Sequence, residues 1–75
     1  MRLTNKQIRK IGKLIGVDFR KIPFKEFKMG IKEEFEHSDI IGYDPILSAR
    51  IAHVHLLEHP RYYTILKEVF KALSS

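Results

Sequence analysis

The segment from Pro45 to Pro60, PILSARIAHVHLLEHP, constrains the fold of this chain more than any other. Placed on a helix at about 100° per residue, its apolar side chains point in nearly every direction. Proline is favoured in the first turn of a helix, and the residue before a proline is pushed out of helical geometry. The two prolines therefore bracket a central helix over residues 45–58, which we expect other helices to cover on several sides.

Capping signals before this segment indicate where the preceding helices begin and end. Thr4 followed by Gln7 forms a capping box, and Gly16 supplies a left-handed stop. Gly12 lies inside that first helix, which suggests that another backbone passes close to it. Pro23 suits the first turn of a second helix. These signals predict helices over residues 4–15 and 23–37.

A last helix follows Pro60 and completes the predicted fold. Its apolar residues recur at i, i+3 and i+4, which predicts that one face is buried: Tyr62, Ile65, Leu66, Val69 and Leu73. Four short helices joined by short loops predict a compact, all-α single domain over residues 1–75 with orthogonal or bundle-like packing. The predicted helices span residues 4–15, 23–37, 45–58 and 61–73.

The composition of the 75 residues limits the environment of the protein. There is no cysteine, which excludes disulfides and thiolate metal sites and is typical of a cytoplasmic protein. No apolar run approaches the roughly 20 residues that a membrane-spanning helix needs, and no signal peptide is evident. We therefore expect a soluble, cytoplasmic protein with no membrane association. The isoleucine-rich, tryptophan-free composition resembles that of thermophilic proteins.

Two mirrored pairs of side chains are the candidate site. Glu34 and His37 are three residues apart on the second predicted helix, and His55 and Glu58 are three apart on the third. Side chains at i and i+3 share one face of a helix, so each pair points in one direction. Paired Glu and His residues on facing helices are how helical bundles assemble carboxylate-bridged metal sites. The spacing predicts a site for one divalent metal ion, with Zn, Fe and Mn as candidates.

Other interpretations of these four residues remain open. Acids and histidines often gather at helix ends, and a Glu–His contact between two helices also serves as a structural clamp. A small ligand or a metal-free active site is a further alternative. Nucleophilic catalysis is not expected, because there is no cysteine and no serine or threonine lies in a strained elbow. An enzymatic function is therefore less expected than a binding or structural one.

Charge supports a different alternative, nucleic-acid binding. Residues 1–32 contain ten lysine and arginine residues against two acids, whereas residues 33–75 contain four against seven. The first predicted helix carries a basic face of the kind that contacts phosphates: Lys6, Arg9, Lys10 and Lys13. No set of side chains for reading base edges accompanies it, so a solvated surface is the preferred interpretation. A homo-oligomeric scaffold is the third hypothesis.

The chain also resembles a group of small microbial and phage proteins catalogued as a domain of unknown function. Two segments carry the resemblance, Glu34-x-Glu36-His37 after Gly30 and the longer segment Ile51-Ala52-x-x-His55-Leu56-x-Glu58-x-Pro60-x-Tyr62-Tyr63-x-x-Leu66. The resemblance implies that Glu34, Glu36, His37, His55 and Glu58 belong to the pattern of the family, whereas His53 does not. It implies no activity. The chain departs from the pattern at Ser38, where a glycine is usual, and at Phe70, where an acid is common, which removes one further potential ligand.

Overall fold

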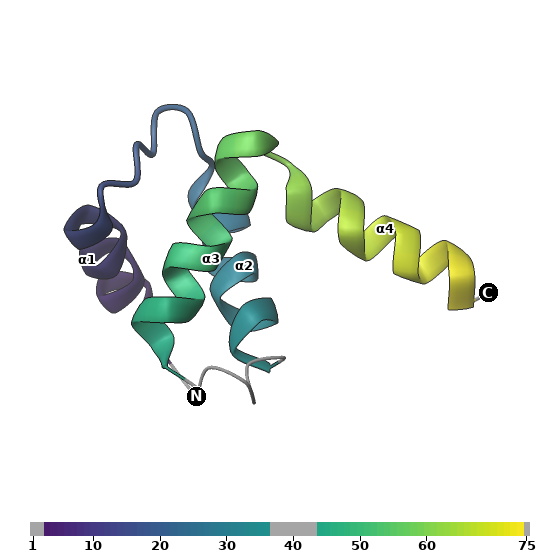
Figure 1. Ribbon diagram of the computed structural model, residues 1–75, viewed down its shortest axis with the longest axis horizontal. Coiled ribbons are helices and arrows are strands. Elements are labelled where there is room, and N and C mark those ends of the chain that lie inside the picture. Colours follow the sequence, from purple (N-terminus) through teal and green to yellow (C-terminus); the bar gives the residue numbers. More distant parts are fainter. Residues whose placement is uncertain (1–2, 37–43, 75) are drawn as a thin grey trace.

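The computed structural model describes residues 3–36 and 44–74, and within those residues it contains four helices and no strand. The predicted all-α fold is therefore confirmed. The helices pack in the arrangement shown in Figure 1, and the structure measures 38 × 29 × 21 Å along its principal axes. Their bounds are Asn5–Ile15 (α1), Phe24–Glu36 (α2), Pro45–Glu58 (α3) and Tyr62–Ser74 (α4).

Local capping accounts for the ends of α1 and α3. Thr4 and Gln7 form both hydrogen bonds of the capping box, and Gly16 closes α1 with a left-handed φ of 86°. The Asp44 side chain accepts hydrogen bonds from the backbone N–H groups of Ile46 and Leu47, with Pro45 in the first turn of α3. These ends depend on neighbouring residues alone.

The core lies where α2 crosses α3. Phe27 and Ile31 on α2 are fully enclosed, as are Ala52 and Leu56 on α3. Small side chains on α3 let the two helices approach, and α1 adds Ile8, which is 3% exposed. This packed centre fixes the relative positions of α1, α2 and α3.

Two helical glycines lie at close contacts. A Cβ atom built on Gly30 of α2 would lie 2.8 Å from the Cβ atom of Ala52 and 2.9 Å from Cδ2 of Tyr63. A Cβ atom on Gly12 of α1 would lie 2.6 Å from the ring of Phe19. The expected close backbone at Gly12 is therefore wrong, because the aromatic rings of the connecting loop and of α2 occupy that space. At Gly30, both α3 and α4 approach the helix.

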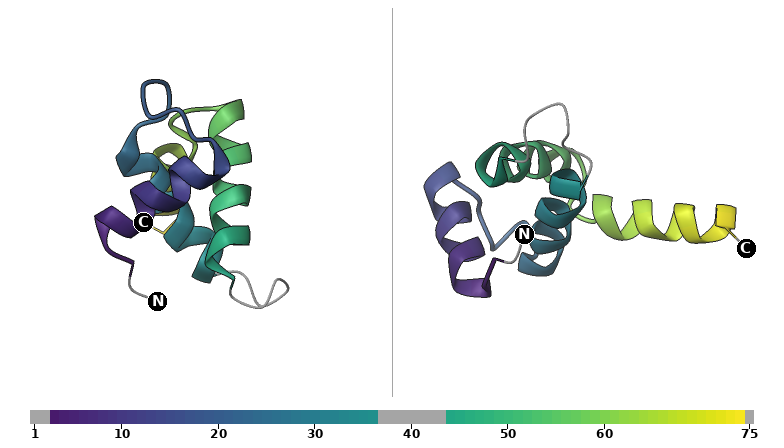
Figure 2. Two further views of the ribbon diagram at one scale, coloured as in Figure 1. Left: turned by 90° about the vertical axis from the view of Figure 1, so that its left-hand side faces the viewer. Right: turned by 90° about the horizontal axis from the view of Figure 1, so that it is seen from below.

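The last helix extends away from the other three. Figure 1 shows α4 leaving the end of α3, and Figure 2, right, shows the same helix projecting from the group formed by α1, α2 and α3. Only its first turns pack against α2 and α3, where Tyr63 is 3% exposed. The predicted buried face is wrong for Ile65, Val69 and Leu73, which are 40%, 49% and 77% exposed. Helical spacing identifies an apolar face, but it does not establish that the chain supplies a partner for it.

The central helix is also less enclosed than expected. Leu47, Val54 and Leu57 on α3 are exposed, because α1, α2 and the start of α4 leave part of its surface uncovered. Three other helices, one of which projects outward, do not cover α3 on every side.

Within the described part of the chain, no helix combines the length and the apolar character needed to cross a bilayer.

Candidate functional site

Three helices each contribute one polar side chain to a shared hydrogen-bonded group. The Tyr63 hydroxyl of α4 donates to Oε2 of Glu34 on α2 at 2.7 Å. The Nδ1 atom of His55 on α3 lies 3.1 Å from the same hydroxyl and 3.3 Å from Glu34 Oε2. The Glu34 and His55 side chains are 20% and 31% exposed, so the group is partly shielded from water. We call these three residues the Glu–Tyr–His cluster.

Proton positions within the cluster follow from its geometry. Because the Tyr63 hydroxyl gives its hydrogen to Glu34, its oxygen is an acceptor toward His55. A neutral His55 therefore carries its hydrogen on Nδ1 and leaves Nε2 as the acceptor nitrogen. The Tyr62 ring stacks on the imidazole at 4.5 Å between centroids with 19° between planes. The imidazole is thus held by polar contacts at its edge and by an aromatic ring on its face.

The environment of Tyr63 keeps its hydroxyl protonated. Burial raises the pKa of Tyr63 above its ordinary value, and the hydrogen bond to Glu34 raises it further. A tyrosinate would lose solvation and would be repelled by the neighbouring carboxylate. Tyr63 therefore acts as a hydrogen-bond donor over the whole range of neutral pH.

A second acid on α2 binds the next residue of α4. Glu26 is 5% exposed, and its carboxylate accepts hydrogen bonds from the backbone N–H of Thr64, at 3.1 Å, and from the Thr64 hydroxyl. Thr64 is the third residue of α4, where backbone N–H groups lack partners within the helix. Glu26 thus caps α4 from another helix, while Glu34 binds the residue before it. Together they fix the start of α4 against α2.

The four predicted site residues do not all meet. Glu34 and His55 come together, as their mirrored spacing predicted. Glu58 does not point inward as expected but is exposed at the end of α3. His37 lies outside the described residues. Among residues 3–36 and 44–74, no three His, Asp or Glu side chains lie close enough to hold a metal ion.

Sequence reasoning missed Glu26 and did not identify Tyr63 as the more buried of the two tyrosines. Tyr62, which was expected in the core, is partly buried and packs against it, whereas Tyr63 is fully part of the core. Glu26 gave no local signal, because its partner Thr64 lies 38 residues further along the chain. The only indication of its role in the sequence was that Glu26 directly precedes Phe27, which is buried on the second helix.

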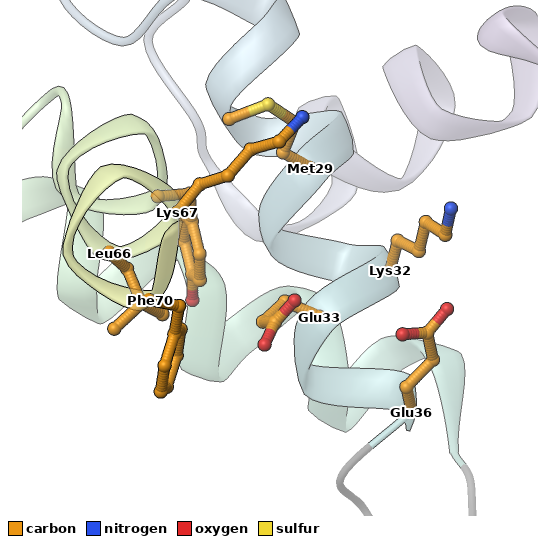
Figure 3. A pocket seen from close by; sticks show the side chains of 8 residues that line it. Met29, Lys32, Glu33, Glu36, Leu66, Lys67 and Phe70 are labelled. Atoms are coloured by element: carbon orange, nitrogen blue, oxygen red, sulfur yellow. The ribbon is translucent and has the colours of Figure 1, made fainter. Parts of the chain in front are cut away.

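A cleft borders the cluster between α2 and α4. It has a volume of about 300 Å³, and Tyr63 of the cluster forms part of its wall. Figure 3 shows Leu66 and Phe70 projecting from α4, with Glu33 on α2 facing them. The cleft combines apolar and charged side chains, and its lining residues are Met29, Lys32, Glu33, Glu36, Tyr63, Leu66, Lys67 and Phe70. We call it the α2/α4 cleft.

Comparison with known proteins identifies a family but no activity. The chain matches no curated protein and no solved structure. Residues 8–71 match the family described as "Protein of unknown function (DUF5661)", which confirms the predicted resemblance to a domain of unknown function. The match includes all three members of the Glu–Tyr–His cluster as well as Glu26 and Thr64. Because it covers most of the sequence, the chain belongs to this family of proteins of unknown function.

Proposed function

We propose that this protein is a self-associating helical scaffold that pairs with a second copy of itself through α4. The observation that carries the proposal is the exposed apolar face of this projecting helix. Ile65, Val69, Phe70 and Leu73 are 40%, 49%, 56% and 77% exposed. At about 100° per residue they fall within an arc of roughly 140°, so they form one continuous surface.

Such a surface favours a protein partner. Scattered exposed apolar residues are ordinary, whereas a contiguous row on one helix is typical of an interaction surface. Contact with a second apolar helix removes this row from water, which stabilises the complex by about 25 cal/mol for each Å² of apolar surface buried. Lys67 lies next to Phe70 at one edge of the row and Glu68 next to Ile65 at the other edge, whereas Lys71 lies on the opposite face of the helix.

The chemistry of the α2/α4 cleft favours a second copy as the partner. Phe70 belongs both to the exposed row and to the cleft wall, so the projecting and receiving surfaces are adjacent. The α2 wall contributes Glu33 and Glu36 against Lys32, a net charge of −1, whereas α4 carries Lys67 and Lys71 against Glu68, a net charge of +1. A two-fold axis would bring the basic half of each α4 toward the acidic wall of the other copy, and such an isologous pair is closed.

The Glu–Tyr–His cluster then has a defined role in the scaffold. With Glu26 and Thr64, it fixes the first turn of α4 on α2 and so sets the direction in which the rest of the helix projects. A helix held in its binding orientation loses less conformational freedom on association. This assigns the cluster to the structural clamp that the sequence offered as one interpretation.

Substitution of Phe70 by glutamate tests the scaffold. We expect the wild-type protein to sediment as a dimer and Phe70→Glu to sediment as a monomer, because the new carboxylate would lie in an apolar interface. Leu14→Glu is the matched control, since Leu14 is 76% exposed on α1 and the same kind of change is made away from α4. Sedimentation equilibrium with thermal melts measures both properties. A wild-type protein that stays monomeric at millimolar concentration contradicts the proposal.

The contact between Glu34 and His55 favours a second candidate function, divalent metal binding. For metal binding, His55 would carry its hydrogen on Nε2 and present a bare Nδ1 to the metal in place of its contact with the Tyr63 hydroxyl. This Nδ1 and Glu34 Oε2 are 3.3 Å apart, which is the separation of two ligands of one transition-metal ion. In this hypothesis Glu34 and His55 are the ligands that α2 and α3 supply, and solvent fills other positions. Removing the metal would then lower the melting temperature.

The metal hypothesis predicts a metal in protein purified without chelator and a lower melting temperature after treatment with EDTA. His55→Gln should abolish both effects, whereas His53→Gln, a matched change on the same helix, should preserve them. Elemental analysis and differential scanning calorimetry provide the readouts. Absence of metal together with an unchanged melting temperature rejects this candidate and leaves the scaffold proposal unaffected.

A further inference from the structure

A second cleft opens between the start of α1 and the side of α2. Its volume is about 720 Å³, which lies in the range of small-molecule sites. We call it the lysine cleft, and its lining residues are Leu3, Ile8, Lys25, Lys28, Met29, Ile31 and Lys32. It contains neither the Glu–Tyr–His cluster nor any residue of α4.

The inner surface of the lysine cleft is apolar. Ile8 and Ile31 are 3% and 1% exposed, so they form part of the packed core beneath it. Leu3 and Met29 are partly buried and pack against the same core. A ligand in this cleft would therefore meet hydrocarbon from both α1 and α2.

The edge of the cleft carries charge of one sign. Lys25, Lys28 and Lys32 follow each other at i, i+3 and i+7 on α2, which places them along one face. Long lysine side chains lay their methylene groups along apolar surface and keep the ammonium group in water. No aspartate or glutamate lines the cleft. An apolar interior with a purely cationic edge is complementary to a molecule with a hydrocarbon tail and an anionic head.

One of the three lysines is already held in position. The ammonium group of Lys28 donates to Oδ1 of Asn5 at 2.8 Å, which links α2 to the first residue of α1. Two hydrogens of that ammonium group remain for a further acceptor. Lys28 is therefore oriented at the edge of the cleft, between α1 and α2, before any ligand arrives.

We propose that the lysine cleft binds one molecule of a single-chain amphiphile with a carboxylate or phosphate head, of the fatty-acid type. The tail lies over Ile8 and Ile31, and the head contacts Lys25, Lys28 and Lys32. The ligand is a single amphiphile molecule taken from solution and not a lipid within a membrane. The site is a concave space between two helices, whereas binding to a bilayer requires an apolar surface that faces outward. The cleft has no aromatic lining residue on which a base could stack, which disfavours a nucleic acid here.

Titration calorimetry with dodecanoate below its micellar concentration tests this site. We expect saturable binding with one ligand per chain, and weaker binding of dodecanol and dodecyltrimethylammonium, which share the tail but lack the anionic head. The double substitution Lys25→Glu with Lys28→Glu should weaken the affinity about tenfold, as two attractive contacts become repulsive. Lys6→Glu with Lys21→Glu is the matched control, because it changes the net charge equally at exposed lysines outside the cleft.

A steric substitution separates occupancy of the cleft from general attraction of anions. Leu3→Trp adds bulk at the cleft wall, so it should abolish dodecanoate binding without altering the net charge. Circular dichroism melts establish that each variant is folded. Three results overturn the proposal: equal affinity for dodecanoate and dodecanol, equal weakening by the two lysine pairs, and unchanged binding by Leu3→Trp. Flotation with phosphatidylglycerol vesicles but no binding of free dodecanoate would also overturn it, because the ligand would then be a membrane surface.

Discussion

Replacing Gly30 by valine should lower the free energy of unfolding by about 3 kcal/mol. A Cβ atom at this position would lie 2.8 Å from the Cβ atom of Ala52 and 2.9 Å from Cδ2 of Tyr63. The Ala52 atom is attached directly to the α3 backbone, and the Tyr63 ring is held by its bond to Glu34. Neither can move aside without displacing a helix. Urea unfolding followed by circular dichroism measures the loss.

Gly12→Val is the matched control, because Gly12 is also a buried glycine within a helix. The nearest atoms to its new side chain belong to the ring of Phe19, a partly exposed residue of the loop between α1 and α2. This ring is the end of a loop side chain and is not attached to a helix backbone, and the Phe27 ring lies further off at 3.1 Å, so the loss of stability should be smaller than at Gly30. An equal loss at both positions, or a neutral effect at Gly30, would show that α3 and α4 do not press on α2 as closely as described.

The parts of this fold that depend on neighbouring residues were predictable. Thr4 with Gln7, and Asp44 with Pro45, mark helix ends through contacts within one turn, so the sequence alone is sufficient to locate them. The outward course of α4 was not predictable in this way. Its apolar spacing matches that of a buried helix, and a spacing pattern carries no information about whether the covering surface lies in the same chain.

The residues of the candidate site were likewise predictable only where the sequence carries a local signal. Glu34 and His55 were identified because each lies in an i, i+3 pair on its own helix. Tyr63 and Glu26 were missed as members, since their contacts join residues 29 and 38 positions apart. Tyrosine beside tyrosine gives no local indication of which ring is buried. The position of α4 on α2 decides that Tyr63 rather than Tyr62 completes the group.

Tyr63→Ala should have the largest effect of any single substitution here and lower the free energy of unfolding by about 3–5 kcal/mol. The ring is 3% exposed and fills the space beside Gly30, so its removal leaves a cavity between α2 and α4. The hydroxyl that joins Glu34 and His55 is lost as well. Because these contacts fix the start of α4, hydrogen exchange should accelerate in Tyr62–Ser74 more than in α1. Urea unfolding and hydrogen exchange by mass spectrometry measure the two effects.

Tyr63→Phe separates the hydroxyl from the ring. The phenylalanine ring still fills the space between α2 and α4, but the hydroxyl that donates to Glu34 is lost. We expect the free energy of unfolding to fall by only about 1 kcal/mol, because water can hydrate the partly exposed carboxylate. Tyr62→Phe is the matched control, because it removes one hydroxyl from the adjacent residue and keeps the stack on His55. It should change the stability by less than about 0.5 kcal/mol. If Tyr63→Phe were as mild as Tyr62→Phe, then the Tyr63 ring and Glu26 would hold α4 without the Tyr63 hydroxyl, and the Glu–Tyr–His cluster would not act as its clamp.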